Sequence, residues 1–213
     1  MVSIAFEYPF SKPVITVPSH ADGYPQESPD YPMYLILDTE TTGVSPTDRL
    51  VSICWALYNT DGAEVAVSYD VIVPEGFTIP SSATAIHGIS TDQARRTGIP
   101  LATALQKLST DISRFAPQLY VGHNVAFDRP IVLNEYQRLR CPENLSQLSS
   151  YCTMKIGTDI CRIPSRGRPG FKWPKLEELH RHLFGRAHSS AHDARGDVSA
   201  TAKCFFELRR RGH

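Results

Sequence analysis

Residues 35–43, with the sequence LILDTETTG, join an apolar run to two carboxylates and a turn. Side chains of a β-strand alternate between its two faces, so Asp38 and Glu40 point to the same side. Like charges held side by side repel each other unless a cation lies between them. Hard divalent cations such as Mg²⁺ and Mn²⁺ prefer oxygen ligands of this kind. The stretch therefore indicates either a metal site at the end of a central strand or a strand that ends in solvated acids.

The length and composition of the chain indicate one substantial globular domain. Its 213 residues are enough to bury a core, and no apolar run approaches the ~20 residues of a membrane helix. The N-terminus lacks the basic and apolar regions of a secretory signal. The five cysteines are scattered, without a Cys-x-x-Cys pair, which indicates reduced thiols and no structural zinc. We expect a cytoplasmic protein without a membrane partner.

The net charge is zero, but the two signs are unevenly distributed. Residues 1–100 hold 4 Lys and Arg against 12 Asp and Glu, and residues 101–213 hold 18 against 10. One explanation is chance combined with solvated helix faces. The other is an acidic metal site that faces a basic surface for a phosphate backbone. Global neutrality favours local capture of a strand end over extensive duplex binding.

The order of the predicted elements indicates an α/β domain with a mixed sheet. Apolar patterns predict strands over 33–38, 50–58, 64–73 and 119–122, the first three as an antiparallel meander. Helical spacing predicts helices over 91–97, 101–115, 127–140, 176–184 and 194–211, with 151–156 as a strand or short helix. We expect loops over 74–90 and 163–174. The domain covers residues 32–213 and follows an irregular, proline-containing arm over residues 1–31 with one short strand near residues 14–17.

Three further segments carry candidate functional residues: 85–89 (AIHGI), 121–128 (VGHNVAFD) and 192–197 (HDARGD). With residues 38–43, they resemble in order and spacing the motifs of the DEDD superfamily of 3′–5′ exonucleases, in its histidine-bearing DnaQ-like branch. The motif Asp-x-Glu-Thr-Thr-Gly falls on residues 38–43 and His-Asn-x-x-Phe-Asp on residues 123–128. The third motif, His followed five residues later by Asp, falls on His192 and Asp197, and the loop motif His-Gly-Ile on residues 87–89. The resemblance extends over residues 33–205.

This resemblance implies a ribonuclease H-like fold and a metal-dependent 3′–5′ exonuclease. Such an enzyme releases nucleoside 5′-monophosphates from single-stranded DNA or, less favoured, RNA. The catalytic residues would be Asp38, Glu40, Asp128 and Asp197, as ligands of two Mg²⁺ or Mn²⁺ ions, and His192 as general base. Two ions about 3.5–4 Å apart stabilise both the attacking and the leaving oxygen of a phosphodiester. A histidine suits the base because it titrates near neutrality.

The position of the third motif has an alternative, because His188 and Asp193 are also five residues apart. We prefer His192 with Asp197, since an apolar helical face follows Asp197 and the family pattern Asp-x-x-Ala-Thr matches residues 197–201. Five residues turn a helix by roughly 500°, so His192 should precede the helix and Asp197 lie in its early turns. Asp193 then becomes a helix cap or first-turn acid, and His188 a loop residue.

The residues that contact the substrate are open to two interpretations. The resemblance implies that Thr41 and Thr42 contact the terminal nucleotide, that His87 lies near its sugar or base, and that Asn124 helps to hold the strand or the second motif. A structural explanation has about equal weight. In that case residues 41–43 simply form a turn, and Asn124 is a helix-entry residue.

The basic segment before the helix predicted over residues 176–184 also has two interpretations. Residues 162–175 hold five basic residues around Phe171 and Trp173, which could form a single-strand clamp by phosphate contact and base stacking. The alternative, which we slightly favour, is a solvated loop pinned by Trp173. We expect His180, His182 and His188 to be surface histidines rather than a metal site, because His180 and His182 face apart on a helix.

Two rival functions concern the partners of the chain. One is a proofreading subunit that acts only when bound to a polymerase, and the other is a non-catalytic nucleic-acid-binding module. The chain ends at His213, just past the last predicted helix, which favours a stand-alone enzyme. The arm could still dock a polymerase or a second copy of the chain. A binding module is disfavoured because all four acids and the histidine are present.

Overall fold

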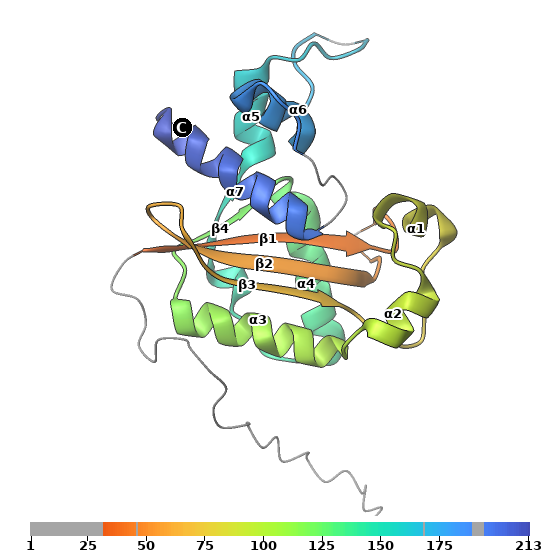
Figure 1. Ribbon diagram of the computed structural model, residues 1–213. Helices are drawn as coiled ribbons and strands as arrows, with labels where there is room; N and C mark the ends of the chain where they lie inside the picture. Colours follow the sequence, from red (N-terminus) through yellow and green to blue (C-terminus); the bar gives the residue numbers. More distant parts are fainter. Residues whose placement is uncertain (1–31, 46, 168, 189–193) are drawn as a thin grey trace, which may run out of the picture.

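A five-stranded mixed sheet of order β3-β2-β1-β4-β5 forms the centre of the computed structural model, which describes residues 32–45, 47–167, 169–188 and 194–213 (Figure 1). The strands are β1 (Met33–Thr41), β2 (Leu50–Asn59), β3 (Glu64–Val71), β4 (Leu119–Gly122) and β5 (Ser149–Cys152). β2 is antiparallel to β1 and β3, while β4 is parallel to β1 and β5. The predicted meander and mixed sheet are confirmed, and β1 is the central strand.

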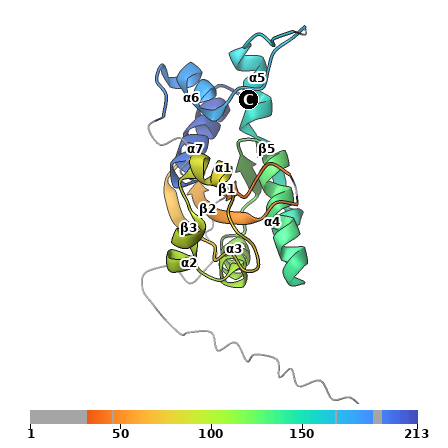
Figure 2. The same ribbon diagram turned by 90° about the vertical axis from the view of Figure 1, so that its right-hand side faces the viewer.

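Helices cover both faces of this sheet. They are α1 (Ser81–His87), α2 (Thr91–Thr97), α3 (Leu101–Phe115), α4 (Val125–Leu139), α5 (Thr153–Cys161), α6 (Leu176–Phe184) and α7 (Ala194–Arg210), with a 3-10 turn at Leu145–Gln147. α3 and α4 pack on one face and α7 on the other, while α5 and α6 lie beyond the sheet against α7 (Figures 1 and 2). No helix among the described residues is both long and apolar enough to cross a membrane.

The side chains of β1 divide between two separate apolar clusters. Leu35 and Leu37 pack with the buried residues of α3 and α4, whereas Tyr34 and Ile36 pack with those of α7. This alternation follows from the twofold period of a strand. It places Asp38 and Glu40 on the α7 face.

The amphipathic patterns of the two longest predicted helices are confirmed. The stripe of α3 is buried at Leu101, Leu105, Leu108, Ile112 and Phe115, and the face of α7 at Val198, Ala202, Phe205 and Leu208. Burial of such stripes is the main stabilisation of a surface helix. Their packing fixes α7, and therefore its first turn, against the sheet.

Several local predictions differ from the structure. Residues 74–90 are not all loop, because α1 begins directly after Pro80 and ends at Gly88, whose φ of +78° suits glycine. β1 continues to Thr41 and α4 begins at Val125. Residues 151–156 divide between β5 and α5 at Thr153. The arm over 1–31, with its predicted strand near residues 14–17, lies outside the described residues.

Candidate active site

Three carboxylates meet at the end of β1. One oxygen each from Asp38, Glu40 and Asp197 lies within 4.8 Å of the other two, and all three residues are partly buried. β1 supplies the first two on its α7 face, and Asp197 lies in the first turn of α7, where it was predicted. Carboxylate oxygens gathered this closely can hold a hard divalent cation. The residues therefore fit Mg²⁺ or Mn²⁺.

The fourth predicted acid, Asp128, does not belong to this group of three. It is buried in the first turn of α4, where its Oδ1 accepts hydrogen bonds from the backbone N–H (3.1 Å) and the hydroxyl (2.8 Å) of Thr39. Burial raises the pKa of Asp128, the bonds from Thr39 oppose this shift, and the charge of Asp197 adds to it. Asp128 is thus electrostatically linked to the cluster but held by β1.

Tyr120 is a further residue of this region that the sequence did not single out. It is fully buried in β4, and its hydroxyl has no hydrogen-bond partner among the described residues. Burial raises the pKa of Tyr120 far above its usual value, and the charges of Asp128 and Asp38 add to the shift. The phenol therefore stays protonated beside two candidate metal ligands. The sequence offered one signal for Tyr120, because this residue lies in the predicted strand that leads to residues 123–128.

The candidate base His192 and Asp193 lie outside the described residues, so the structure does not place them. His188 is described and lies in the loop before α7, as predicted. Its Nε2 is 3.6 Å from Asp197 Oδ1, and its side chain is only 8% exposed. The expectation of surface histidines is wrong for His180 and the side chain of His188, which are buried, and right for His182. The ring centroids of His180 and His188 are 5.8 Å apart, because the loop that carries His188 folds back on α6.

His123 lies between β4 and α4 and contacts two further segments of the chain. One ring nitrogen, Nδ1, lies 2.9 Å from Thr153 Oγ1 and the other, Nε2, lies 3.0 Å from the carbonyl oxygen of Pro174. Burial lowers the pKa of His123 to about 4, and the nearby His188 contributes to the shift. A neutral imidazole that donates Nε2–H to Pro174 accounts for both contacts. His123 therefore ties the start of α4 to α5 and to the segment before α6.

A pocket of about 400 Å³ lies next to Glu40, between the end of β1 and α1. Its lining residues are Thr39, Glu40, Thr41, Thr42, Gly43, Val44, Ser82, Ala83, Ile86, His87 and Phe127. The predicted substrate-contact residues Thr41, Thr42 and His87 thus meet in one cavity. His87 Nδ1 accepts the N–H of Ile89 (3.1 Å), and burial lowers the pKa of this imidazole. A neutral ring therefore forms part of the pocket wall.

The two threonine hydroxyls and Asn124 have structural roles of their own. The hydroxyl of Thr41 donates to the Gly43 carbonyl, and that of Thr42 lies 2.9 Å from the backbone N–H of Arg49. These bonds shape the loop after β1 and the pocket wall. Asn124 precedes α4 with a φ of +78°, the left-handed geometry that asparagine tolerates better than most residues. It is not among the residues that line the pocket beside Glu40.

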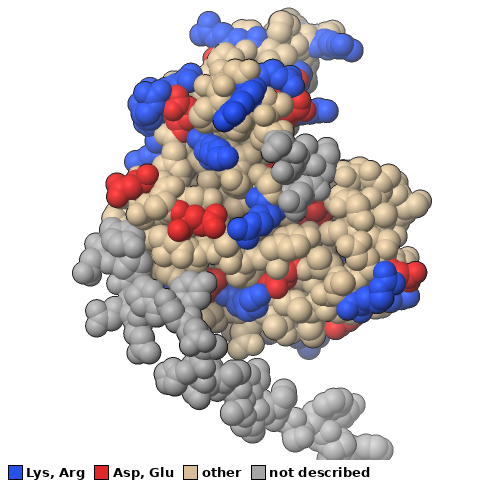
Figure 3. Space-filling model, in the orientation of Figure 1, with Lys and Arg blue, Asp and Glu red and all other residues tan. Residues whose placement is uncertain are grey.

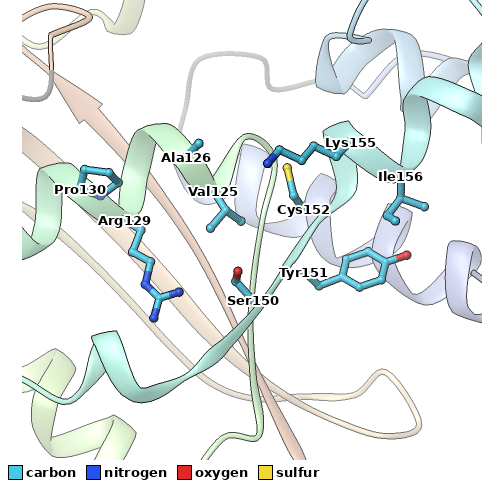
Figure 4. Close-up of a pocket in the computed structure, with 9 residues that line it drawn as sticks. All are labelled: Val125, Ala126, Arg129, Pro130, Ser150, Tyr151, Cys152, Lys155 and Ile156. Carbon is cyan, nitrogen blue, oxygen red and sulfur yellow. The ribbon is translucent and has the colours of Figure 1, made fainter.

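A second pocket, of about 420 Å³, lies between α4, β5 and α5 (Figure 4). Val125, Ala126, Arg129, Pro130, Ser150, Tyr151, Cys152, Lys155 and Ile156 line it, and none of the four acids does. The guanidinium of Arg129 donates to the carbonyls of Leu145, Ser146 and Leu148. This cation therefore stabilises the connection into β5, and the pocket is separate from the candidate active site.

The mixed five-stranded sheet with helices on both faces is a ribonuclease H-like fold, and the acid cluster lies at the end of its central strand. The exonuclease family model RNase_T matches residues 35–205, and the chain belongs to this DnaQ-like exonuclease family. A DNA polymerase III subunit epsilon-like protein of Rhodobacter capsulatus is 35% identical over 179 residues, covering 82% of this chain and 23% of that protein.

Two further proteins are similar to the chain. The uncharacterized exonuclease CP81 of Escherichia phage 186 is 28% identical, with 79% of this chain and 88% of that protein covered. E. coli exonuclease I, solved in complex with a dT13 oligonucleotide, matches with a TM-score of 0.71 at 23% identity, over 84% of this chain and 41% of that chain. This chain thus spans less than half of exonuclease I and a smaller share of the Rhodobacter protein.

Proposed function

We propose that residues 32–213 form a metal-dependent 3′–5′ exonuclease domain that acts on single-stranded ends, with DNA favoured over RNA, and releases nucleoside 5′-monophosphates. The observation that carries this proposal is the convergence of Asp38, Glu40 and Asp197 next to the pocket of about 400 Å³. Membership of an exonuclease family supports the reaction class. The position of the pocket beside Glu40 supports an end of a strand as substrate, because a pocket of this size can receive one terminal nucleoside.

The acids would hold two divalent cations, Mg²⁺ or Mn²⁺. Asp38, Glu40 and Asp197 offer converging oxygens, and Asp128 would join them from α4. The chemistry that such cations supply is activation of water and neutralisation of the charge on the leaving 3′ oxygen. Thr39 orients Asp128 by hydrogen bonds to Oδ1. The second oxygen, Oδ2, would therefore be the atom that binds a cation.

His192 would take the proton of the attacking water as general base. In the sequence it precedes α7 by two residues, and Asp197 lies in the first turn of that helix. His188 is the competing candidate because its Nε2 already lies 3.6 Å from Asp197. A base fixed against a metal ligand is constrained in its reach toward water, and this favours His192.

The terminal nucleoside would occupy the pocket beside Glu40. Its rim carries two exposed apolar side chains, Val44 and Ile86, which offer contacts to a base without reading its identity. His87 and the loop of Thr41 and Thr42 would contact the sugar. A pocket of this composition supports cleavage with little sequence preference.

The decisive experiment uses 5′-labelled single-stranded DNA and RNA with Mg²⁺, Mn²⁺ or EDTA. We expect a ladder that shortens from the 3′ end, depends on the metal and is stronger on DNA, with no cleavage by Asp38→Asn. Absence of cleavage by the folded wild-type protein with metal present would contradict the proposal for the isolated chain.

A pair of histidine variants identifies the general base. We expect His192→Gln to lower kcat on the order of 10²-fold or more while Mn²⁺ still raises the melting temperature. His188→Gln is the matched control, and we expect a much smaller effect. If His188→Gln is instead the damaging variant, the assignment of the third motif is wrong.

A second candidate function is a proofreading subunit that is active only with a polymerase. The similarity to a DNA polymerase III subunit epsilon-like protein favours it. Addition of a replicative polymerase to the cleavage assay separates the two functions. Activity that appears only with the polymerase would select the second one.

A further inference from the structure

The segment between α5 and α6 forms a short hairpin that extends from the end of the molecule formed by α5 and α6 (Figures 1 and 2). Pro164 pairs with Phe171 in an antiparallel bridge, the N–H of Ser165 donates to the Gly170 carbonyl (3.0 Å), and that of Lys172 to Ile163 (2.9 Å). These contacts fix both arms of the hairpin. We call residues 162–167 and 169–175 the α5–α6 hairpin, and Arg168 lies outside the described residues.

Two aromatic side chains of this hairpin are exposed. Phe171 is 45% and Trp173 is 64% exposed, whereas the other tryptophan of the chain, Trp55, is buried. The interpretation of Trp173 as a side chain that pins the loop is therefore wrong, since the buried neighbour is Pro174. Large aromatic faces left in water are favourable positions for stacking on another planar group.

Basic residues accompany the two aromatic residues in the hairpin. Arg162, Arg166 and Lys175 are exposed, and Lys and Arg side chains are prominent at this end of the molecule in Figure 3. The amino group of Lys172 is paired with Glu178 (2.5 Å), so this cation is compensated within the chain. The hairpin therefore combines exposed aromatic faces with exposed positive charge.

One hydrogen bond joins the end of the hairpin to His123, at the start of α4. Trp173 precedes Pro174, whose carbonyl accepts the Nε2–H of His123 (3.0 Å). His123 in turn lies near His188, whose Nε2 is 3.6 Å from Asp197. Trp173 is thus next in the chain to a residue that is held against His123.

We propose that the α5–α6 hairpin binds the nucleotides that precede the terminal one. Phe171 and Trp173 would stack on bases, while Arg162, Arg166 and Lys175 would contact phosphates. The faces of the bases are accessible in a single strand and hidden in a duplex, so the partner is single-stranded nucleic acid. This inference rests on the proposed function, because it assumes that the strand end lies at the acid cluster.

Tryptophan fluorescence offers a direct test of contact, because the chain has only two tryptophans and Trp55 is buried. With Asp38→Asn to prevent cleavage, we expect a dT15 oligonucleotide to quench the emission of Trp173. Trp173→Phe should remove most of the quenched signal. Quenching that persists in Trp173→Phe, or its absence in both proteins, would overturn the inference.

Separate measurements of binding and of hydrolysis test this inference independently of the proposed function. In the Asp38→Asn background, Trp173→Ala should weaken anisotropy-measured binding of labelled dT15 about tenfold, with Tyr69→Ala on β3 as an exposed aromatic control. With the acids intact, Trp173→Ala should raise KM for dT15 but leave hydrolysis of thymidine 5′-monophosphate p-nitrophenyl ester unchanged, because this ester has no preceding nucleotide.

The possible outcomes are distinguishable. If the wild-type protein hydrolyses neither substrate, the proposed function fails while the binding assay still tests the hairpin. If it hydrolyses both and Trp173→Ala changes neither binding nor KM, the hairpin inference is wrong, and an acidic protein partner becomes the next candidate for this surface. Equal losses on both substrates would also overturn the inference, because they would place Trp173 in the catalytic site itself.

Discussion

Glu135 and the carboxylates at the end of β1 differ in the charged groups that surround them. Glu135 on α4 is fully buried, and its Oε1 contacts Arg49 and Arg138, each at 2.9 Å, and the N–H of Leu50. At the end of β1, by contrast, carboxylates from β1 and α7 converge on one another. A buried acid that meets two arginines stabilises the fold, whereas acids that converge on each other suit a bound cation. The comparison therefore separates a structural acid from candidate functional acids.

The largest expected effect is the loss of activity when the cluster is changed. Asp38→Asn should lower the cleavage rate by about 10³-fold or more, because a negative ligand is lost from the site. The melting temperature without metal should stay the same or rise, since repulsion within the cluster decreases. Cleavage assays and thermal unfolding in EDTA test this, with Asp61→Asn in an exposed turn as control. A clear loss of stability would mean that Asp38 is structural.

The second effect is on stability and concerns Glu135. Glu135→Gln should lower the free energy of unfolding by about 3 kcal/mol, because two arginines lose their buried partner. Cleavage at temperatures below the unfolding transition should persist. Chemical denaturation with parallel activity measurements tests both expectations. Unchanged stability would show that Glu135, like the acids at the end of β1, is not required for the stability of the fold.

A third effect of similar or smaller size depends on pH and on His123. Its pKa falls from 6.5 to about 4 on folding, so the unfolded chain binds more protons between these values. Stability should therefore be unaffected above pH 6.5 and fall by about 3 kcal/mol as the pH decreases toward 4. His123→Gln should flatten this dependence, whereas His182→Gln at the surface should not. Parallel pH profiles for wild type and His123→Gln would be inconsistent with a neutral buried ring.

The smallest effect is expected for Glu207 on α7. This acid also contacts two arginines, Arg210 and Arg211, but its side chain is 14% exposed against 1% for Glu135, and the Arg210 side chain is 71% exposed. Exposed ion pairs contribute little because water and salt screen them. The melting temperature of Glu207→Gln should match that of the wild type within experimental error. A loss comparable to that of Glu135→Gln would show that burial does not govern the difference between these two acids.

The sequence predicted what depends on local patterns. The twofold alternation around Asp38 and Glu40 and the helical stripe after Asp197 correctly placed three acids on β1 and α7. Helix α1 was missed because two prolines and the pair His87-Gly88 suggested a loop, although a proline directly before a helix is compatible with its first turn.

Contacts between distant segments could not be predicted from one sequence. Thr39 and Asp128 are 89 residues apart, and Arg49 and Glu135 are 86 apart, so no local spacing connects them. The burial of His180 likewise depends on the carbonyl of Arg186, which the turn after α6 brings to 2.8 Å from Nδ1. These contacts arise only when the two faces of the sheet are covered.

The division of β1 between two faces has a consequence for insertions and deletions. Because alternate residues serve opposite faces, removing one residue before Asp38 would exchange the two sets of side chains. Thr39 would then turn toward α7, and the carboxylates would turn toward the core beside α4. A single deleted residue in β1 would therefore misplace every side chain on one side of the deletion, and we expect it to be more damaging than many substitutions.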